Sequence, residues 1–145
     1  MASPDRDFGL ATAALLLAGL FASGTATAAH QYSCTIERVE HSHGEEDSPL
    51  RLYRKAYIGE KFTVDRKTGL MKGSLENSYA TLPEVIDPGS KDNSFKVVTT
   101  MKLSQGEGRG SNLYALVVDE FVEGSRKPFV FLQNEAVYFG FCEHR

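Results

Sequence analysis

The chain has 145 residues, of which 24% are charged, and its formal net charge is −3. This length accommodates a single domain. A charge so close to balance provides no electrostatic footprint for nucleic acid, so we exclude nucleic acid as a partner.

The first thirty residues have the pattern of an export signal. Residues 8–22 form a continuous apolar run, and Ala26-Thr27-Ala28 matches an A-x-A cleavage site. The alternative is a membrane anchor, but the run is shorter than the about 20 residues that cross a bilayer. We therefore expect residues 1–28 to be cleaved as a signal peptide. Residues 29–145 would then form one secreted β domain, periplasmic or extracellular, with no stable membrane span.

The first half of the predicted domain mixes strands with one short helix. Residues 32–39 alternate between apolar and polar, which predicts a strand with one buried face. Ser48, Pro49 and Gly59 are typical of helix ends and favour a short helix over residues 49–58, although the same residues also alternate as a strand. Residues 62–64 and 70–75, joined by a turn that ends at Gly69, predict a hairpin.

The second half predicts only strands and turns. We expect strands at residues 81–87, 95–103 and 112–122, followed by a final hairpin of residues 128–133 and 136–142. The chain would thus be all-β. We predict an antiparallel meander of seven or eight strands that closes into a barrel or a sandwich.

The two cysteines lie near the two ends of the predicted domain. Because Cys34 and Cys142 are the only cysteines of an exported chain, they predict one disulfide with a single possible pairing. That bond would join the first strand to the last, which favours a barrel.

The densest group of metal-ligand side chains follows the first strand. His41 and His43, with Glu45 beside them, have donor atoms suited to zinc or copper, and we expected His30 and His144 to approach from the chain ends. The alternative is a solvated polar loop that binds nothing, since the spacing matches neither a zinc finger nor an HExxH helix. We predict no other cofactor.

Signals for catalysis are weak. Both cysteines are assigned to the disulfide, and no serine stands in a G-x-S-x-G context. Among the carboxylates, only Asp119 shares a predicted strand face with Leu113 and Val117, which makes it the candidate for a buried carboxylate, but a salt bridge or the end of the strand is the favoured explanation. These observations predict a protein that is not an enzyme.

In size, export, strand number and terminal cysteines the chain resembles small exported barrels such as the periplasmic inhibitors of lysozyme. The Ser-Gly-x-x-Tyr loop of one such inhibitor family is absent, so the resemblance implies a fold rather than a target. The leading hypothesis is a binding or inhibitory module of the cell envelope, acting on an unknown protein or envelope component. The alternatives are a metal-binding protein that uses the His41 and His43 loop, and a carrier of a small ligand.

Overall fold

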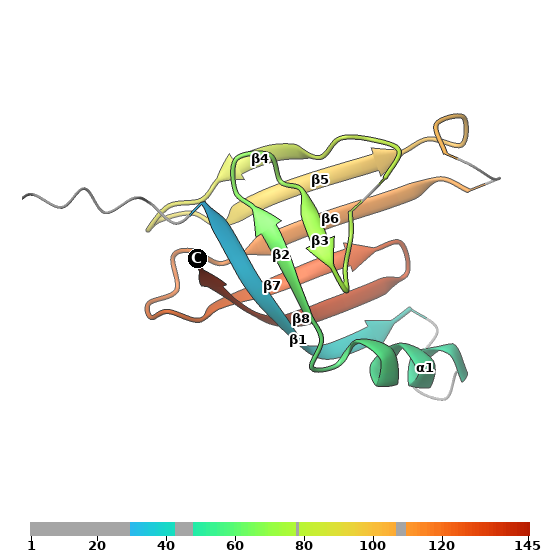
Figure 1. Ribbon diagram of the computed structural model, residues 1–145, viewed down its shortest axis with the longest axis horizontal. Helices are drawn as coiled ribbons and strands as arrows, with labels where there is room; N and C mark the ends of the chain where they lie inside the picture. The colour runs from blue at the N-terminus through green and yellow to red at the C-terminus, as the bar shows by residue number, and fades with distance from the viewer. Residues whose placement is uncertain (1–29, 43–47, 78, 107–109) are drawn as a thin grey trace, which may run out of the picture.

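The computed structural model describes residues 30–42, 48–77, 79–106 and 110–145, and its strands form one antiparallel sheet curled into a half-barrel (Figure 1). The elements are β1 (Gln31–His41), α1 (Ser48–Tyr57), β2 (Lys61–Asp65), β3 (Met71–Gly73), β4 (Glu84–Pro88), β5 (Phe95–Met101), β6 (Asn112–Val118), β7 (Lys127–Gln133) and β8 (Ala136–His144). The spatial order is β3-β2-β1-β8-β7-β6-β5-β4, so β3 and β4 are the edges. The predicted all-β meander and its short helix are confirmed.

The first and last strands of the domain lie side by side. Strand β1 pairs antiparallel with β8, and Cys34 lies opposite Cys142. A disulfide joins these two residues across 108 positions of sequence, as predicted. The sheet therefore has its two terminal strands at its centre, held together by both a hydrogen-bonded ladder and a covalent bond.

A β-bulge bends this central pair. The register between β1 and β8 shifts between Ile36 and Arg38, which leaves Glu37 as the extra residue. Gly140 lies opposite Ile36, and a Cβ atom built at this glycine would overlap the carbonyl oxygen of Thr35. The close approach of the two backbones thus requires glycine at this position.

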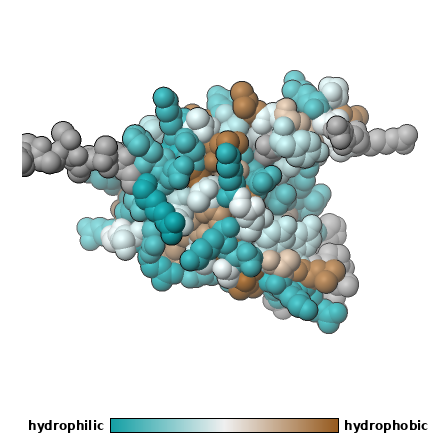
Figure 2. All heavy atoms as spheres, in the orientation of Figure 1, coloured by the Kyte–Doolittle hydropathy of each residue, from teal (hydrophilic) through white to brown (hydrophobic). Residues whose placement is uncertain are grey.

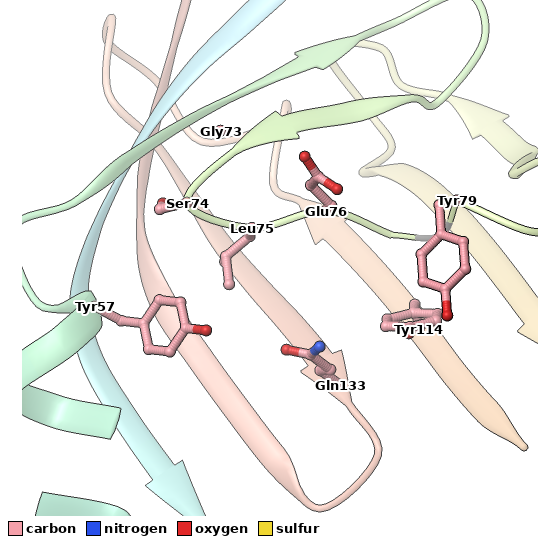
Figure 3. Close-up of a pocket in the computed structure, with 8 residues that line it drawn as sticks. All are labelled: Tyr57, Gly73, Ser74, Leu75, Glu76, Tyr79, Tyr114 and Gln133. Atoms are coloured by element: carbon pink, nitrogen blue, oxygen red, sulfur yellow. The ribbon is translucent and has the colours of Figure 1, made fainter. Parts of the chain in front are cut away.

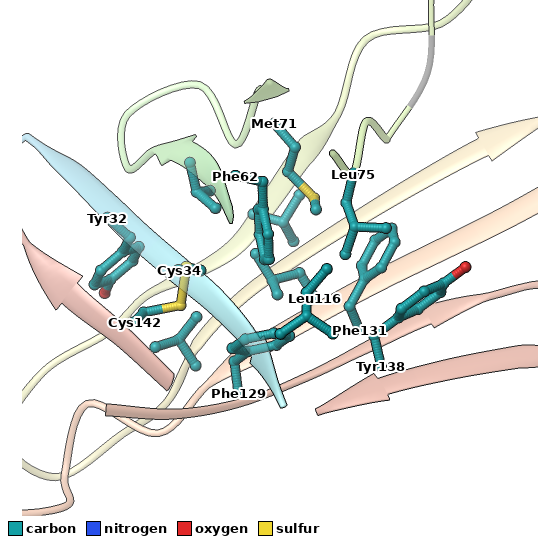
Figure 4. Close-up of a cluster of buried hydrophobic side chains, with 14 of the residues drawn as sticks. Tyr32, Cys34, Phe62, Met71, Leu75, Leu116, Phe129, Phe131, Tyr138 and Cys142 are labelled. Atoms are coloured by element: carbon teal, nitrogen blue, oxygen red, sulfur yellow. A yellow bond between two sulfur atoms is a disulfide. The ribbon is translucent and has the colours of Figure 1, made fainter. Parts of the chain in front are cut away.

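The concave face of the sheet carries the hydrophobic core. Alternate side chains of every long strand point inward, where the rings of Phe62 and Phe129 meet edge to face at 5.3 Å (Figure 4). The buried side chains include Tyr32, Ile36, Val39, Val64, Met71, Leu75, Phe95, Val97, Leu116, Val118, Phe131 and Tyr138. Among the described residues, these side chains form one continuous hydrophobic cluster.

Helix α1 packs against β1 at one end of the half-barrel. It is followed by Gly59, whose φ of 88° is a conformation that glycine adopts readily. The Nε atom of Arg54 donates a hydrogen bond to the carbonyl oxygen of Val39, which holds the helix on the strand. Leu52 and Ile58 remain exposed, and hydrophobic side chains accordingly gather near α1 at the lower right of Figure 2.

Two strands end earlier than their apolar patterns predict. Strand β6 stops at Val118 rather than at residue 122, and β5 stops at Met101. After Val118 the backbone turns, and the amide of Val122 donates to the carbonyl oxygen of Asp119.

In the described part of the chain, no helix is long and apolar enough to cross a membrane.

Candidate functional site

A cluster of polar side chains closes the end of the half-barrel that contains Tyr32. Glu120, in the loop after β6, accepts a hydrogen bond from the Tyr32 hydroxyl. Its Oε1 atom also lies 3.0 Å from Nε2 of His144 and 4.0 Å from the Arg66 guanidinium. The Glu120 side chain is only 9% exposed. One carboxylate therefore connects β1, the β2–β3 turn, the loop after β6 and β8.

Burial and this carboxylate both act on Tyr32. Burial raises the pKa of the Tyr32 hydroxyl above its ordinary value, and the hydrogen bond and negative charge of Glu120 raise it further. Gly89 packs so closely that a Cβ atom there would lie 2.9 Å from Cγ of Glu120. Tyr32, Glu120 and His144 contact one another through charged or hydrogen-bonding atoms inside a packed end, which gives the cluster a structural role.

Asp119 follows directly after the last residue of β6, as the favoured strand-end explanation predicts. Asp119 is partly exposed and accepts a hydrogen bond from the Ser94 hydroxyl at 2.9 Å. The alternation of inward and outward side chains ends at Val118, the last residue of β6. In the loop that follows, Glu120 rather than Asp119 points toward the core. In addition, Leu113 and Val117 lie on the convex face of the sheet rather than toward the core.

The opposite end of the half-barrel contains a cavity of about 310 Å³, which we call the tyrosine pocket (Figure 3). It is lined by Tyr57, Gly73, Ser74, Leu75, Glu76, Tyr79, Tyr114 and Gln133. These residues come from α1, from the segment after β3, and from β6 and β7. The volume lies at the lower end of the range of small-ligand sites.

The segment after β3 forms one wall of the pocket because of two residues. Gly73 has a φ of 124°, and a Cβ atom there would lie 2.8 Å from the carbonyl oxygen of Lys61, so the chain leaves β3 at a point that only glycine fits. Buried Asn77 then ties the segment back. Its Nδ2 donates to the Gly69 carbonyl at 2.8 Å, and its Oδ1 accepts from the Met71 amide at 3.3 Å. Glu76 and Leu75 are thereby fixed at the pocket.

Two of the pocket tyrosines rest on core rings. Tyr57 meets Tyr138 edge to face at 5.3 Å, and Tyr114 stacks on Phe131 at 6.3 Å. The rings of Phe131 and Tyr138 are themselves 5.9 Å apart. The two tyrosines are therefore anchored to one aromatic layer, and Figure 3 shows their rings on opposite sides of Leu75 and Gln133.

Among the described residues that line it, the pocket is electron-rich and has no positive side chain. Its eight lining residues include three tyrosines and the exposed carboxylate of Glu76, but no lysine, arginine or histidine. Burial raises the pKa of Tyr114, and the neighbouring Tyr79 raises it further. The pKa of Tyr138 behind the pocket is raised chiefly by burial. At neutral pH Tyr114 and Tyr138 are therefore neutral hydroxyls that can donate hydrogen bonds.

The structure separates the residues predicted to bind metal. His41 pairs with Ala136 at one end of β8, whereas His144 pairs with Tyr32 at the other end, nine residues away along β1 and thus roughly 30 Å distant. His30 lies next to the latter end. The expectation that His30 and His144 approach His41 is therefore wrong, because β1 is extended along its whole length.

The remaining metal prediction rests on His43 and Glu45, which lie outside the described residues. Within residues 30–42, 48–77, 79–106 and 110–145, no group of three or more histidine, cysteine, aspartate or glutamate side chains is placed to hold a metal ion. The His41 and His43 loop stays a prediction.

Sequence reasoning did not identify the tyrosine pocket. Tyr57, Glu76 and Tyr114 belong to separate segments, and no spacing within one element connects them. The only sequence feature that points to this pocket is the amino-acid composition, since the chain has six tyrosines and no tryptophan. Five of the six, namely Tyr53, Tyr57, Tyr79, Tyr114 and Tyr138, line this pocket or form the aromatic contacts behind it.

Comparison with known proteins returned no matching family model, no matching curated protein and no matching solved structure.

Proposed function

We propose that the protein is an exported, non-catalytic binding module that holds an organic cation in the tyrosine pocket. The observation that carries this proposal is the composition of the pocket wall, whose described residues provide three tyrosine rings, one carboxylate and no cationic side chain. Aromatic ring faces attract ammonium groups by their quadrupole, and this attraction strengthens where water is excluded. Glu76 adds a full negative charge at the rim.

The anchoring of the rings supports binding rather than catalysis. Tyr57 and Tyr114 are held against Tyr138 and Phe131, so little side-chain freedom is lost when a guest enters. Among the eight lining residues there is no pair of a nucleophile and a base, which a covalent mechanism needs. The Cys34–Cys142 disulfide is compatible with an oxidising, exported location.

The filled interior favours this pocket over a carrier cavity inside the half-barrel. Phe62, Phe95 and Phe131 are each no more than 2% exposed and occupy the concave space that a carried ligand would need. The tyrosine pocket lies at the end of this packed core. The guest is therefore a compact group, such as a trimethylammonium or a single amine, presented from outside.

Isothermal titration calorimetry with two ligands of the same shape tests the proposal. We expect choline to bind residues 30–145, and 3,3-dimethylbutanol, its uncharged isostere, to bind several-fold more weakly because the cation–π term is lost. Equal affinity for the two ligands, or no heat from either, would contradict the proposal.

Substitutions locate the site. Tyr114→Leu and Glu76→Gln should each weaken choline binding several-fold. The matched controls are Phe121→Leu, an exposed ring in the loop after β6, and Glu84→Gln at the start of β4, because neither residue lines the pocket. If the controls weaken binding as much as the pocket variants, choline binds elsewhere.

A further inference from the structure

The convex face of the sheet carries rows of apolar side chains, which we call the convex patch, and the Arg38 guanidinium lies over the Phe139 ring at 3.8 Å at its β1 side. The patch consists of Val98, Ala115, Val117, Pro128, Val130, Leu132, Val137, Phe139 and Phe141. The register aligns these side chains in rows across β5 to β8, for example Val117 opposite Val130 and Val130 opposite Phe139. All of them are partly or largely exposed to solvent, so the patch spans four strands of open sheet.

No element in the described part of the chain covers this patch. Apart from neighbouring strands, the element pair in extensive contact is α1 with β1, and α1 directs Tyr57 to the concave side against Tyr138. Apolar patches of several hundred Å² on a folded protein usually mark a surface that contacts a partner or a membrane.

Positive charge collects at one end of the patch. A polar hollow of about 210 Å³ is lined by Ser33, Thr35, Lys61, Arg126, Phe141, Glu143 and Arg145. Among the described residues, no carboxylate pairs with Lys61 or Arg145, whereas Arg126 pairs with Glu37 at 2.7 Å. Arg126 also lies 4.2 Å from the centre of the Phe141 ring, so charge and apolar surface are in direct contact.

The face therefore changes from basic to apolar along the strands. One row contains Lys61, Thr35 and Phe141, and it adjoins Arg126. Two steps further along the strands, the row of Val137, Leu132, Ala115 and Val98 is apolar across β8 to β5, and it ends at Glu40 on β1 and at Glu84 on β4. Rows are two residues apart, so the change takes place over roughly 13 Å.

We propose that the convex face docks onto a bilayer that contains anionic phospholipids. Lys61, Arg126 and Arg145 meet the phosphate groups, while the apolar rows enter the boundary between headgroups and acyl chains. Basic residues near an anionic surface and apolar side chains in this boundary both contribute to peripheral binding. This inference is independent of the tyrosine pocket, which opens at a different place on the molecule.

The curvature of the sheet favours a bilayer over a second copy. Two convex faces touch along a narrow zone, whereas a stable protein interface buries about 800 Å² on each partner. A fluid bilayer adapts to a convex surface. A single acyl chain would cover only part of a patch that extends over four strands.

Vesicle flotation of residues 30–145 tests the proposal. We expect the protein to float with phosphatidylcholine vesicles that contain phosphatidylglycerol as the minor lipid, to float much less with pure phosphatidylcholine, and to be released by salt. The double variant Lys61→Glu/Arg145→Glu should lower vesicle affinity by about ten-fold or more, since each basic residue contributes a several-fold factor. Val130→Glu should abolish flotation while thermal unfolding shows an intact fold.

The matched controls change the same chemistry elsewhere. Lys67→Glu/Lys91→Glu reverses two exposed charges in turns, and Leu82→Glu alters an apolar side chain that is 90% exposed outside the patch. These variants should float like the unmodified protein. Absence of flotation, flotation independent of phosphatidylglycerol, equal losses in the controls, or a dimer in light scattering that Val130→Glu dissociates would each overturn the proposal.

Discussion

The Tyr32 hydroxyl donates a hydrogen bond to Oε1 of Glu120, and this contact joins the first strand to a loop 88 residues away. Glu120→Ala would leave the buried hydroxyl and the partly buried Arg66 without their shared acceptor. We expect a loss of about 2 kcal/mol in the free energy of unfolding, since a buried polar group that loses its partner costs about 1–3 kcal/mol. Urea unfolding followed by circular dichroism measures the change.

Glu123→Ala is the matched control for this substitution. Glu123 lies in the same loop region but is exposed, and its removal should change the free energy of unfolding by less than about 0.5 kcal/mol. If both variants are equally stable, the cluster at this end does not hold the half-barrel together.

The buried tyrosines predict a loss of stability in alkali. Burial raises the pKa values of Tyr32 and Tyr138 in the folded state above the value of about 10 for an unfolded chain. Because these pKa values are raised in the folded state, the two tyrosines make their full contribution to the free energy of unfolding below about pH 10. This contribution is lost as the pH rises above that value. Free energies of unfolding measured from neutral pH upward should therefore fall beyond pH 10.

Tyr138→Phe identifies the source of this pH dependence. The variant lacks one hydroxyl that must stay protonated in the fold, so its stability should fall less steeply above about pH 10 than that of the unmodified protein. Tyr79→Phe removes a hydroxyl from a ring that is 79% exposed and serves as the comparison. Identical slopes for the unmodified protein and Tyr138→Phe would contradict the prediction.

Most of the sheet could be predicted from the sequence, because the alternation of apolar and polar residues within one segment indicates which side chains of a strand are buried. Residues 32–39 alternate in chain order, and their inward side chains Cys34 and Ile36 are fully buried in β1. The pairing of Cys34 with Cys142 followed from arithmetic, since only two cysteines exist. The first inference needs only the residues of one segment, and the second needs only the number of cysteines.

The closed end and the tyrosine pocket were not predictable in this way. The Glu120 side chain is only 9% exposed because β6 ends at Val118 and the backbone turns, and an apolar pattern that runs on to Val122 hides that turn. Tyr57 and Tyr114 become neighbours of one cavity only through the curl of the sheet and the path of the segment after β3. Such contacts depend on tertiary geometry that a single sequence does not encode locally.

The disulfide should contribute a large part of the stability. Replacing both cysteines, as in Cys34→Ala/Cys142→Ala, releases a loop of 108 residues in the unfolded chain. The loop-entropy model gives a ceiling of about 4–5 kcal/mol for this release. We expect chemical denaturation to show a loss of several kcal/mol, and a loss below about 1 kcal/mol would show that the β1–β8 ladder suffices by itself.

The bulge in the central strand pair gives the sharpest test of the backbone. Gly140→Ala introduces a methyl group where the Thr35 carbonyl oxygen already lies, and the ring of Phe129 blocks a shift, with its nearest atom 2.8 Å from the new Cβ. Overpacking of this kind typically costs about 1–3 kcal/mol, and here backbone would have to move in two paired strands that also carry the disulfide.

Gly110→Ala is the matched control, because a Cβ atom at Gly110 meets nothing within 4 Å. Thermal and urea unfolding should show a marked loss for Gly140→Ala and almost none for Gly110→Ala. If the two variants are equally stable, β1 and β8 do not approach each other as closely at the bulge as the fold requires.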